Sequence, residues 1–493
     1  MTDNKTPLTD RSAAWREELR NAIPAKVRTS IPRAKMPELT PAYRVTTFTE
    51  EVNRGLSAQQ AVVEASRCLD CPTPTCMEGC PVSIEIPSFI KNIQRGRADL
   101  ASKVLRMTSA LPAVCGRVCP QERQCESRCI YHKMKKEPVA IGYLERFAAD
   151  SDRELRKEGK IGDKELPVSN GIRVAVAGSG PAGLSFAGEM ARRGFEVEVF
   201  EALHEIGGVL KYGIPEFRLP NAIVDDELDT LRALGVKFHP NTIIGKTLSF
   251  DDLVKMGFKG LFVASGAGLP RFMDVPGENL IGIMSSNEYL TRINLMGAGR
   301  EGNATPVARG KRVAVIGGGN TAMDSVRTAL RMGAERAMIV YRRSEAEMPA
   351  RVEEVHHAKE EGVEFLTLAN PVEYIGDDKG RVRAMRIQRM ELGEPDASGR
   401  RKPVPVPGAI EEIEVDVVVV SVGVSPNPLI PASVPGLDVT PKGTIAVDGS
   451  LRTSIPSIYA GGDIVRGGAT VILAMGDGRS AAARMAKSLL SEK

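Results

Sequence analysis

Short apolar blocks recur after residue 170, and two of them are followed by a glycine-rich turn and an amphipathic segment. The first block spans residues 173–177 and the second spans residues 312–316. A short apolar run that ends in a turn and leads into a helical pattern is typical of a buried strand in a parallel sheet. The pattern therefore predicts an α/β protein that contains two Rossmann-like (glutathione reductase-like) units.

The chain before residue 165 follows a helical pattern instead. Apolar spacing predicts helices over residues 50–67 and 86–107, and a further amphipathic stretch covers residues 15–23. We therefore expect an N-terminal all-α domain ahead of the two Rossmann-like units.

The turn after the first block carries the fingerprint of a dinucleotide-binding unit. Gly178 permits a tight turn, Gly180 lets the backbone approach a pyrophosphate, and Gly183 lets the helix pack closely on the strand. Glu201 follows the next strand, 196–200, where a carboxylate binds ribose hydroxyls. The sequence predicts a dinucleotide site here; the alternative is an ordinary βα turn.

The second glycine turn leads into a strand that ends in basic residues. The turn consists of Gly317, Gly319, Asn320, Thr321 and Ala322. After the next strand, Arg342 and Arg343 stand where the first unit has its carboxylate. Arginine accommodates a ribose 2′-phosphate, which a carboxylate would repel. We therefore expect FAD at the first unit and NADP(H) at the second; the alternative is a pair of solvated arginines.

Residues near the C-terminal end complete the expected flavin site. Asp463 follows a strand and can bind a ribityl hydroxyl, and a helix from Thr470 would direct its positive N-terminus at a flavin that becomes anionic on reduction. The FAD domain is thus expected to be split, with the NADP(H) domain inserted in it. The expected FAD-binding residues are Gly178, Gly180, Pro181, Ala182, Gly183, Glu201, Gly208, Gly213, Ala264, Gly266, Gly462, Asp463, Thr470 and Val471.

All eight cysteines lie between Cys68 and Cys129. Closely spaced cysteines followed by proline are typical of iron–sulfur ligation, in which the last cysteine of one run can serve the other cluster. Zinc and disulfides are the alternatives, but zinc motifs more often pair two C-x-x-C steps, and only one occurs here. Eight thiols suffice for two clusters.

Composition and charge exclude several classes of function. The formal net charge is +4, and no long basic run occurs, so nucleic acid is not an expected partner. The amino-terminal residues lack the apolar core of a signal peptide, and the apolar run 415–424 is too short to cross a bilayer. These features predict a soluble cytoplasmic protein without a membrane partner. His356 and His357 lie on a charged helix at 345–361 and are expected to be solvated.

With these motifs in place, the chain resembles the small (beta) subunit of NADPH-dependent glutamate synthase. Relatives of that subunit include the large subunit of the bifurcating NADH-dependent ferredoxin:NADP oxidoreductase and the amino-terminal half of dihydropyrimidine dehydrogenase. The cysteine pattern and residues 212–220, 317–324 and 460–463 carry the resemblance. It implies two 4Fe–4S clusters, the first held by Cys68, Cys71, Cys76 and Glu145 and the second by Cys80, Cys119, Cys125 and Cys129, with Cys115 spare.

The implied domains are residues 1–165 for the helical domain with two 4Fe–4S clusters, 171–305 for the first part of the FAD-binding domain, 306–412 for the NADP(H)-binding domain, and 413–493 for the second part of the FAD-binding domain. The resemblance implies an NADPH-oxidising subunit of a hetero-oligomer. Its partner would be the glutamate synthase large (alpha) subunit, which makes glutamate from glutamine and 2-oxoglutarate.

One spacing favours a different partner. Cys119 and Cys125 lie farther apart than in typical glutamate synthase small subunits, and they resemble the ferredoxin-linked and dihydropyrimidine dehydrogenase branches. Five basic residues lie around the second run of cysteines in the sequence, from Cys115 to Cys129, and could steer an acidic ferredoxin: Arg123, Arg128, Lys133, Lys135 and Lys136. A ferredoxin-linked NADP(H) oxidoreductase or a dihydropyrimidine dehydrogenase-type electron-input subunit is therefore the alternative. A cluster-binding assembly subunit without catalysis is a third, and the intact second glycine turn argues against it.

Overall fold

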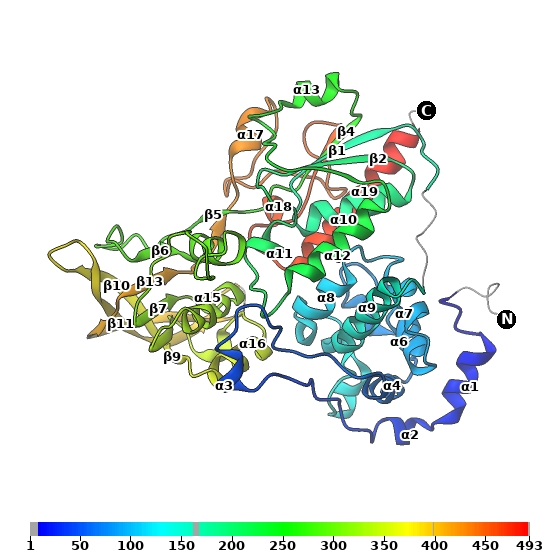
Figure 1. Ribbon diagram of the computed structural model, residues 1–493, viewed down its shortest axis with the longest axis horizontal. Coiled ribbons are helices and arrows are strands. Elements are labelled where there is room, and N and C mark those ends of the chain that lie inside the picture. Colours follow the sequence, from blue (N-terminus) through cyan, green and yellow to red (C-terminus); the bar gives the residue numbers. More distant parts are fainter. Residues whose placement is uncertain (1–7, 161–166, 398, 492–493) are drawn as a thin grey trace.

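Three packed parts make up the protein, a helical part and two parts built on parallel sheets (Figure 1). The computed structural model describes residues 8–160, 167–397 and 399–491. In Figure 1 the helical part, blue to cyan, lies below the first sheet, and the second sheet lies to the left of both. No helix in the described ranges is long and apolar enough to cross a membrane.

The helical part contains the N-terminal elements. These are α1 (Ala14–Ala22), α2 (Ala25–Arg28), α3 (Pro41–Arg44), α4 (Ala58–Arg67), α5 (Thr75–Glu78), α6 (Ile86–Gln94), α7 (Ala98–Leu105), α8 (Pro112–Val118), η1 (Gln121–Arg123), η2 (Glu126–Arg128), η3 (Ile130–Met134) and α9 (Ile141–Lys157). The helix expected from residue 50 begins later, because Ser57 and Gln60 form a capping box that fixes the first turn of α4. The helix expected over 86–107 is divided at Gly96, whose φ is +75°.

The first sheet is parallel, with strand order β15-β4-β1-β2-β3. Its strands are β1 (Arg173–Ala177), β2 (Glu196–Phe200), β3 (Lys237–His239), β4 (Gly260–Val263) and β15 (Ile458–Ala460). Its helices include α10 (Pro181–Arg192), α11 (Val209–Tyr212), α12 (Asn221–Arg232), α13 (Phe250–Lys255), α17 (Leu429–Ser433), α18 (Asp463–Arg466) and α19 (Val471–Ser491). Since β15 joins strands that precede it by about two hundred residues, the expected insertion of one Rossmann-like unit into another is confirmed.

The second sheet is also parallel, with order β6-β13-β7-β8-β9. Its strands are β6 (Ile283–Ser285), β7 (Arg312–Ile316), β8 (Arg336–Tyr341), β9 (Glu364–Thr367) and β13 (Val417–Val420), and α14 (Ser286–Leu290), η4 (Thr291–Leu295), α15 (Asn320–Arg331), η5 (Glu345–Glu347) and α16 (Val352–Glu360) belong with them. The sheet thus extends beyond the expected range of 306–412 at both ends. The reason is that β13 is a run of valines buried on both faces, a pattern that does not reveal which of two parallel sheets it joins.

Two smaller sheets complete the fold. One is antiparallel and contains β10 (Ala369–Gly376), β11 (Val382–Pro395) and β12 (Arg401–Glu414), and the other pairs β5 (Leu269–Pro270) with β14 (Val424–Ser425). The strands β11 and β12 pair antiparallel and form a long hairpin.

An extended N-terminal segment joins the helical part to the second sheet. It places α3 beside α16, as the blue trace in Figure 1 shows, and Arg44 Nη2 donates a hydrogen bond to His357 O at 3.1 Å. The backbone N–H of Val52 donates to Phe217 O at 2.9 Å. Phe217 is buried, and the Arg331 guanidinium lies 3.9 Å from the centroid of its ring. The loop 212–220 is thus held between all three parts.

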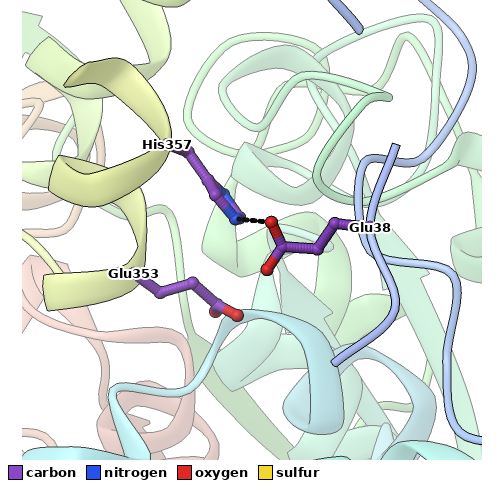
Figure 2. A group of neighbouring side chains, drawn as sticks. All are labelled: Glu38, Glu353 and His357. Carbon is purple, nitrogen blue, oxygen red and sulfur yellow. Dashed lines mark ion pairs between the residues drawn. The ribbon is translucent and has the colours of Figure 1, made fainter. Parts of the chain in front are cut away.

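His357 lies in this interface and is not solvated. Its side chain is 2% exposed, and Nε2 lies 3.2 Å from Glu38 Oε2 (Figure 2). Glu353, on the same helix, points into the same space. The expectation of a solvated histidine was wrong because the helix pattern alone does not show that residues 38–44 cover this face; His356, by contrast, is exposed.

Candidate functional site

The first glycine turn has the shape that a bound dinucleotide requires. A Cβ on Gly178, where φ is +104°, would lie 2.5 Å from Ala264 O, and a Cβ on Gly183 would lie 2.0 Å from Gly178 O. Neither position tolerates a side chain. Gly180 has no atom within 4 Å of a Cβ position, so its outer side is open. Since α10 begins directly after it at Pro181, free N–H groups face the open side.

Glu201 holds this turn to the end of β2. Its Oε2 accepts a hydrogen bond from Ser179 N at 2.8 Å and another from Ser179 Oγ, and its Oε1 accepts from Leu203 N at 2.9 Å. The side chain is buried. Each carboxylate oxygen can accept further bonds, so this arrangement fits the expected contact with a ribose.

The remaining expected flavin residues lie at the same edge of the first sheet. Burial and the nearby carboxylates of Asp463 and Glu201 raise the pKa of Tyr212 to about 12. Burial also raises the pKa of Asp463 to about 6. A Cβ on Gly462 would lie 2.9 Å from the Cβ of Ala182. These groups come from separate parts of the chain and converge at the carboxyl ends of the parallel strands, where ligands of such sheets bind.

The other residues expected to bind the flavin differ in their surroundings. Gly208, with φ of +55°, has a Cβ position 2.9 Å from the Cα of Gly180, so it packs on the turn. Gly213 packs on Val209 of its own short helix, which is a structural role. Ala264 and Gly266 follow β4, Thr470 directly precedes α19, and Val471 begins it.

The second glycine turn repeats the geometry of the first. A Cβ on Gly317, where φ is +141°, would lie 2.3 Å from Ser421 O, whereas the Cβ position of Gly319 is open. Asn320 Oδ1 accepts a hydrogen bond from Arg351 N at 2.9 Å, so this side chain fixes the start of α16. Ala322 is buried and Thr321 is exposed.

The two arginines after β8 have different surroundings. Arg343 is 6% exposed; its Nη2 pairs with Asp396 and its Nε donates to Arg401 O at 2.8 Å, so it is committed to the hairpin of β11 and β12. Arg342 is exposed, and its side chain makes no hydrogen bond or ion pair within the described ranges. Of the expected pair, only Arg342 is free to meet a phosphate.

The first cysteine group lines one cavity. Its four thiols belong to Cys68, Cys71, Cys76 and Cys129, and the walls include Ile86, Ile90 and Tyr131. Burial raises the pKa of Cys76, and the thiols of Cys68, Cys129 and Cys71 raise it further. The expected assignment of Glu145 to this group and of Cys129 to the other was therefore wrong. The 3-10 helix η3 follows Cys129 and leads the chain back beside Cys68, where Tyr131 donates to Arg67 O at 2.6 Å.

The second group is more deeply buried. Burial raises the pKa of Cys125, as do the carboxylates of Glu126 and Glu145 and the thiols of Cys80 and Cys119. Burial raises the pKa of Glu145 to about 8. Glu145 Oε1 is buried without a hydrogen-bond partner. Three thiols and an unpartnered carboxylate oxygen fit the four ligand positions of a 4Fe–4S cluster.

Helix packing explains why Glu145 belongs to the second group. A Cβ on Gly116 of α8 would lie 2.5 Å from Arg146 N of α9, so the two helices touch at this glycine. Glu145 is the neighbour of Arg146 in the chain, and its carboxylate lies close enough to Cys80 and Cys125 to raise the pKa of both thiols.

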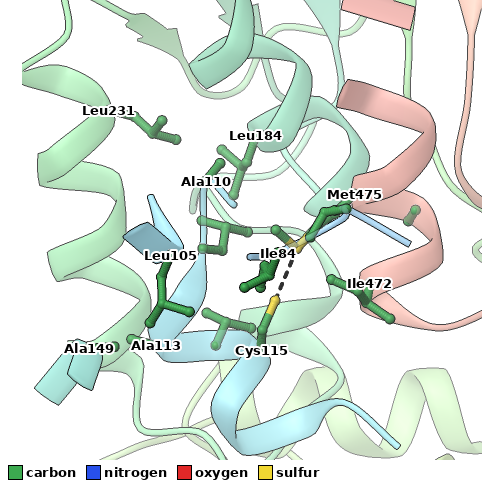
Figure 3. Close-up of a cluster of buried hydrophobic side chains, with 14 of the residues drawn as sticks. Ile84, Leu105, Ala110, Ala113, Cys115, Ala149, Leu184, Leu231, Ile472 and Met475 are labelled. Atoms are coloured by element: carbon green, nitrogen blue, oxygen red, sulfur yellow. Dashed lines mark hydrogen bonds between the residues drawn. The ribbon is translucent and has the colours of Figure 1, made fainter. Parts of the chain in front are cut away.

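The second group also contacts the helix that begins at the expected flavin. Cys115 Sγ donates to Met475 Sδ at 3.4 Å (Figure 3). A Cβ on Gly476 would lie 3.0 Å from Pro81 O, next to Cys80. The four thiols of the first group are half-exposed, as is Cys80 of the second group, whereas Cys115, Cys119 and Cys125 are buried. The second cysteine group therefore lies next to the expected flavin site, and the first cysteine group lies nearer the protein surface.

The sequence did not indicate several residues that shape the site. Arg16 of α1 is fully buried and its Nη2 pairs with Asp70 Oδ1 at 2.7 Å, which fixes the loop between Cys68 and Cys71. Asp477 of α19 accepts a hydrogen bond from Gly462 N at 2.9 Å. An acidic residue in an apolar helix was the one available signal for Asp477; none marked Arg16.

Comparison with known proteins agrees with this architecture. Residues 44–157 match the family of dihydropyrimidine dehydrogenase domain II with its 4Fe–4S cluster, and residues 172–478 match the pyridine nucleotide-disulphide oxidoreductases. The small chain of NADPH-dependent glutamate synthase from Azospirillum brasilense is 37% identical over 454 residues, which cover 91% of this chain and 93% of that one. The chain belongs to the glutamate synthase small chain family. The small chain from Escherichia coli is 36% identical over 88% of this chain and 92% of that one.

Proteins other than glutamate synthase subunits are also similar to this chain. The beta subunit of the NADP⁺-dependent formate dehydrogenase of Moorella thermoacetica is 39% identical over 83% of this chain and 59% of that one. FprA of Mycobacterium tuberculosis in complex with NADPH shares the fold, with a TM-score of 0.55 and 20% identity over 65% of this chain and 85% of that chain. The expected class is confirmed: an NADP(H)-dependent oxidoreductase of the glutamate synthase small chain family, with FAD and 4Fe–4S clusters as cofactors.

Proposed function

We propose that this protein oxidises NADPH and passes the electrons to the large subunit of a glutamate synthase in the cytoplasm. When bound, the cofactors supply hydride transfer from NADPH to FAD and one-electron transfer through the two clusters. The protein's own residues bind these groups, orient them and exclude water. The synthesis of glutamate from glutamine and 2-oxoglutarate belongs to the partner subunit.

One observation carries the proposal. Helix α19 begins at Val471, beside Asp463 and Gly462, and one turn later its Met475 contacts the second cysteine group. An element that touches both sites gives electrons a short path between them. This contact supports electron flow from the flavin to the second group, then to the half-exposed first group.

The residues that would hold each group follow from the geometry. Gly180 and the N-terminus of α10 would receive the pyrophosphate of FAD, with Glu201 on its ribose and Asp463 on its ribityl chain. Gly319 and the N-terminus of α15 would receive the pyrophosphate of NADPH, and Arg342 its 2′-phosphate.

The clusters would take the corrected ligand sets. Cys68, Cys71, Cys76 and Cys129 would hold the first cluster, and Cys80, Cys119, Cys125 and Glu145 would hold the second. The half-exposed set is the one that a partner can approach.

The decisive experiment uses the chain purified anaerobically with its cofactors. NADPH should bleach the flavin, and addition of a glutamate synthase large subunit with glutamine and 2-oxoglutarate should yield glutamate. Glutamate formation that needs both chains supports the proposal. Flavin bleaching without glutamate, together with reduction of added ferredoxin, would move the protein to the ferredoxin-linked branch.

A specific observation favours ferredoxin as the second candidate. Arg128, Lys133 and Lys135 are exposed on the segment around Cys129, at the half-exposed cysteine group. The other two basic residues of that segment have structural contacts: Arg123 donates to Met348 O at 2.9 Å, and Lys136 donates to Thr29 O at 2.5 Å. Exposed positive charge beside a cluster suits an acidic electron carrier.

A further inference from the structure

We propose that Arg123 is a positioning residue for the NADP(H) site, because it holds the segment against which the second glycine turn packs. That segment consists of residues 348–352, and we call it the bracing segment. The inference rests on the proposed function, which places NADP(H) at the second glycine turn. It deepens that function by naming a residue of the helical part on which the nucleotide site depends.

The bracing segment contacts the glycine turn on one side. The backbone N–H of Ala350 donates to Gly318 O at 3.2 Å, and the N–H of Arg351 donates to Asn320 Oδ1 at 2.9 Å. Gly318 lies in the turn, and Asn320 begins α15. These two bonds join the bracing segment to the groups proposed to receive the pyrophosphate of NADPH.

Arg123 holds the other side of the bracing segment. Its Nη2 donates to Met348 O at 2.9 Å and to Ala350 O at 3.1 Å, and its Nη1 donates to Pro349 O at 2.9 Å. A planar guanidinium that bonds to three consecutive carbonyl oxygens fixes the path of the backbone between them. Since Arg123 belongs to η1 of the helical part, the nucleotide turn is held from another part of the fold.

The two residues before Arg123 add to this contact. Glu122 Oε1 accepts a hydrogen bond from Val352 N at 3.2 Å. Gln121 Oε1 accepts one from Arg351 Nη2 at 3.1 Å, and both of these side chains are buried. All three residues of η1 therefore bond to the bracing segment.

The same loop carries two of the proposed cluster ligands, Cys119 and Cys125. The residues that separate these cysteines, 120–124, include the three that bond to the bracing segment. The spacing between the two cysteines thus supplies the contact between the helical part and the second glycine turn. One loop serves both the nucleotide site and the second cysteine group.

A braced turn should bind a nucleotide more tightly than a free one. Glycine-rich backbone has access to many conformations, and only those that direct their N–H groups outward can hold a pyrophosphate. The apparent dissociation constant rises as the fraction of molecules in the competent conformation falls. Because NADPH and NADH share the pyrophosphate, loss of the brace should weaken both equally, whereas Arg342 meets only the 2′-phosphate.

The test compares Arg123→Met and Arg123→Lys with the matched control Arg97→Met, all in the protein with its cofactors. Arg97 is also an exposed arginine of the helical part, and its Nη2 pairs with Asp99 at 2.7 Å. Calorimetry gives the Kd of NADP⁺, and flavin reduction gives kcat/KM for NADPH and for NADH. Iron content, flavin content and the denaturation midpoint are measured in the same samples.

Arg123→Met should raise the Kd of NADP⁺ about 3- to 10-fold, the effect expected for the loss of hydrogen bonds that stabilise the competent turn. The ratio of kcat/KM for NADPH to that for NADH should stay at the wild-type value. Arg123→Lys should raise the Kd less, because an ammonium still donates to part of the carbonyl row. Arg97→Met should leave the Kd unchanged, and all variants should keep full iron and flavin.

An unchanged Kd in Arg123→Met, or an equal rise in Arg97→Met, would overturn the proposal. A fall in the preference for NADPH over NADH would overturn it too, since Arg123 would then act on the 2′-phosphate. Failure of the proposed function is a separate result: the wild-type protein would not bind NADP⁺, and NADPH would not bleach its flavin.

Discussion

Arg343 Nη2 lies 2.7 Å from Asp396 Oδ2, and this pair ties the end of β8 to the hairpin of β11 and β12. Its neighbour Arg342 is exposed and takes no part in that contact. Two adjacent arginines that look equivalent in the sequence therefore have separate tasks. Arg343 supports the second sheet, and Arg342 is the candidate for recognition of the 2′-phosphate.

We expect Arg342→Ala to reduce the preference for NADPH over NADH. A charge-assisted hydrogen bond contributes about 1.5–3 kcal/mol, so the ratio of the two kcat/KM values should fall about 10- to 100-fold. The kcat/KM for NADH should change little, because NADH has no 2′-phosphate. Arg343→Ala is the control: it should lower the denaturation midpoint and change the ratio much less. The reverse outcome would assign the phosphate to Arg343.

The regrouped cysteines give a second prediction. Cys129→Ala and Cys76→Ala should abolish the same EPR signal, because both thiols line one cavity. Cys125→Ala should abolish the other signal. The variants should each lose about half of the iron and keep the flavin. If Cys129→Ala removed the signal that Cys125→Ala removes, the regrouping would be wrong.

A buried charge network between α15 and α16 of the second sheet supplies a third prediction. Arg327 is fully buried; its Nη2 lies 2.7 Å from Glu361, and it also pairs with Glu354. Arg327→Met leaves two buried carboxylates short of a partner and should lower the free energy of unfolding by about 3–5 kcal/mol. Urea denaturation followed by circular dichroism measures the change.

A matched control for this prediction lies in the same part of the fold. Arg336 pairs with Glu364 at 2.7 Å, but the two side chains are 45% and 50% exposed. Arg336→Met should therefore cost less than about 1 kcal/mol. Equal costs for the two variants would show that the buried network does not stabilise the protein.

The same network predicts how stability depends on pH. Burial by itself would raise the pKa of Glu354 and of Glu361, but neighbouring arginines outweigh this effect. The pKa of each carboxyl group is therefore about 2, below the ordinary value of 4.5. The arginines are Arg218 and Arg327 for Glu354, and Arg327 and Arg331 for Glu361. Carboxylates with a lowered pKa bind fewer protons in the folded state than in the unfolded state. Their contribution is therefore complete above about pH 4.5 and is lost as the pH falls toward 2.

This sign can be checked with one variant. Glu354→Gln removes one of the two titrating groups, so the slope of unfolding free energy against pH between 4.5 and 2 should be shallower than in the wild type. An identical slope would assign the acid sensitivity to other carboxylates.

The exposed basic residues near Cys129 give a fifth prediction. If the partner is an acidic ferredoxin, Lys133→Glu with Lys135→Glu should slow its reduction about tenfold or more at low salt, and the wild-type rate should fall as salt rises. Flavin reduction by NADPH should not change. Lys255→Glu with Lys259→Glu, exposed residues near the first sheet, is the control. A rate independent of salt and of both variants would argue against docking at this segment.

Local signals in the sequence were sufficient for much of the fold. The strands at 173–177 and 312–316 were predicted to the residue, because a glycine turn marks where each one ends. The sequence also predicted that two distant stretches of the chain build the first sheet, because the strand before Asp463 needs a neighbouring strand to pair with. The open positions at Gly180 and Gly319 agree with their expected roles.

Features that depend on distant contacts were not predictable in this way. Spacing alone did not show that η3 returns Cys129 to Cys68, or that α9 brings Glu145 to Cys119. The burial of His357 depends on Glu38, more than three hundred residues earlier. Sequence patterns report the local preference of each segment, whereas these features result from packing between segments.

The contact between Cys115 and Met475 also orders events during synthesis. The two residues are 360 positions apart, so the second cysteine group lacks part of its wall until α19 has been made and has docked. A nascent chain that stops before α19 leaves these thiols uncovered, while the first group already has all the residues of its cavity by Ile141. The first group thus has all the residues of its cavity once Ile141 has been made, whereas the second group gains Met475 only after α19 follows.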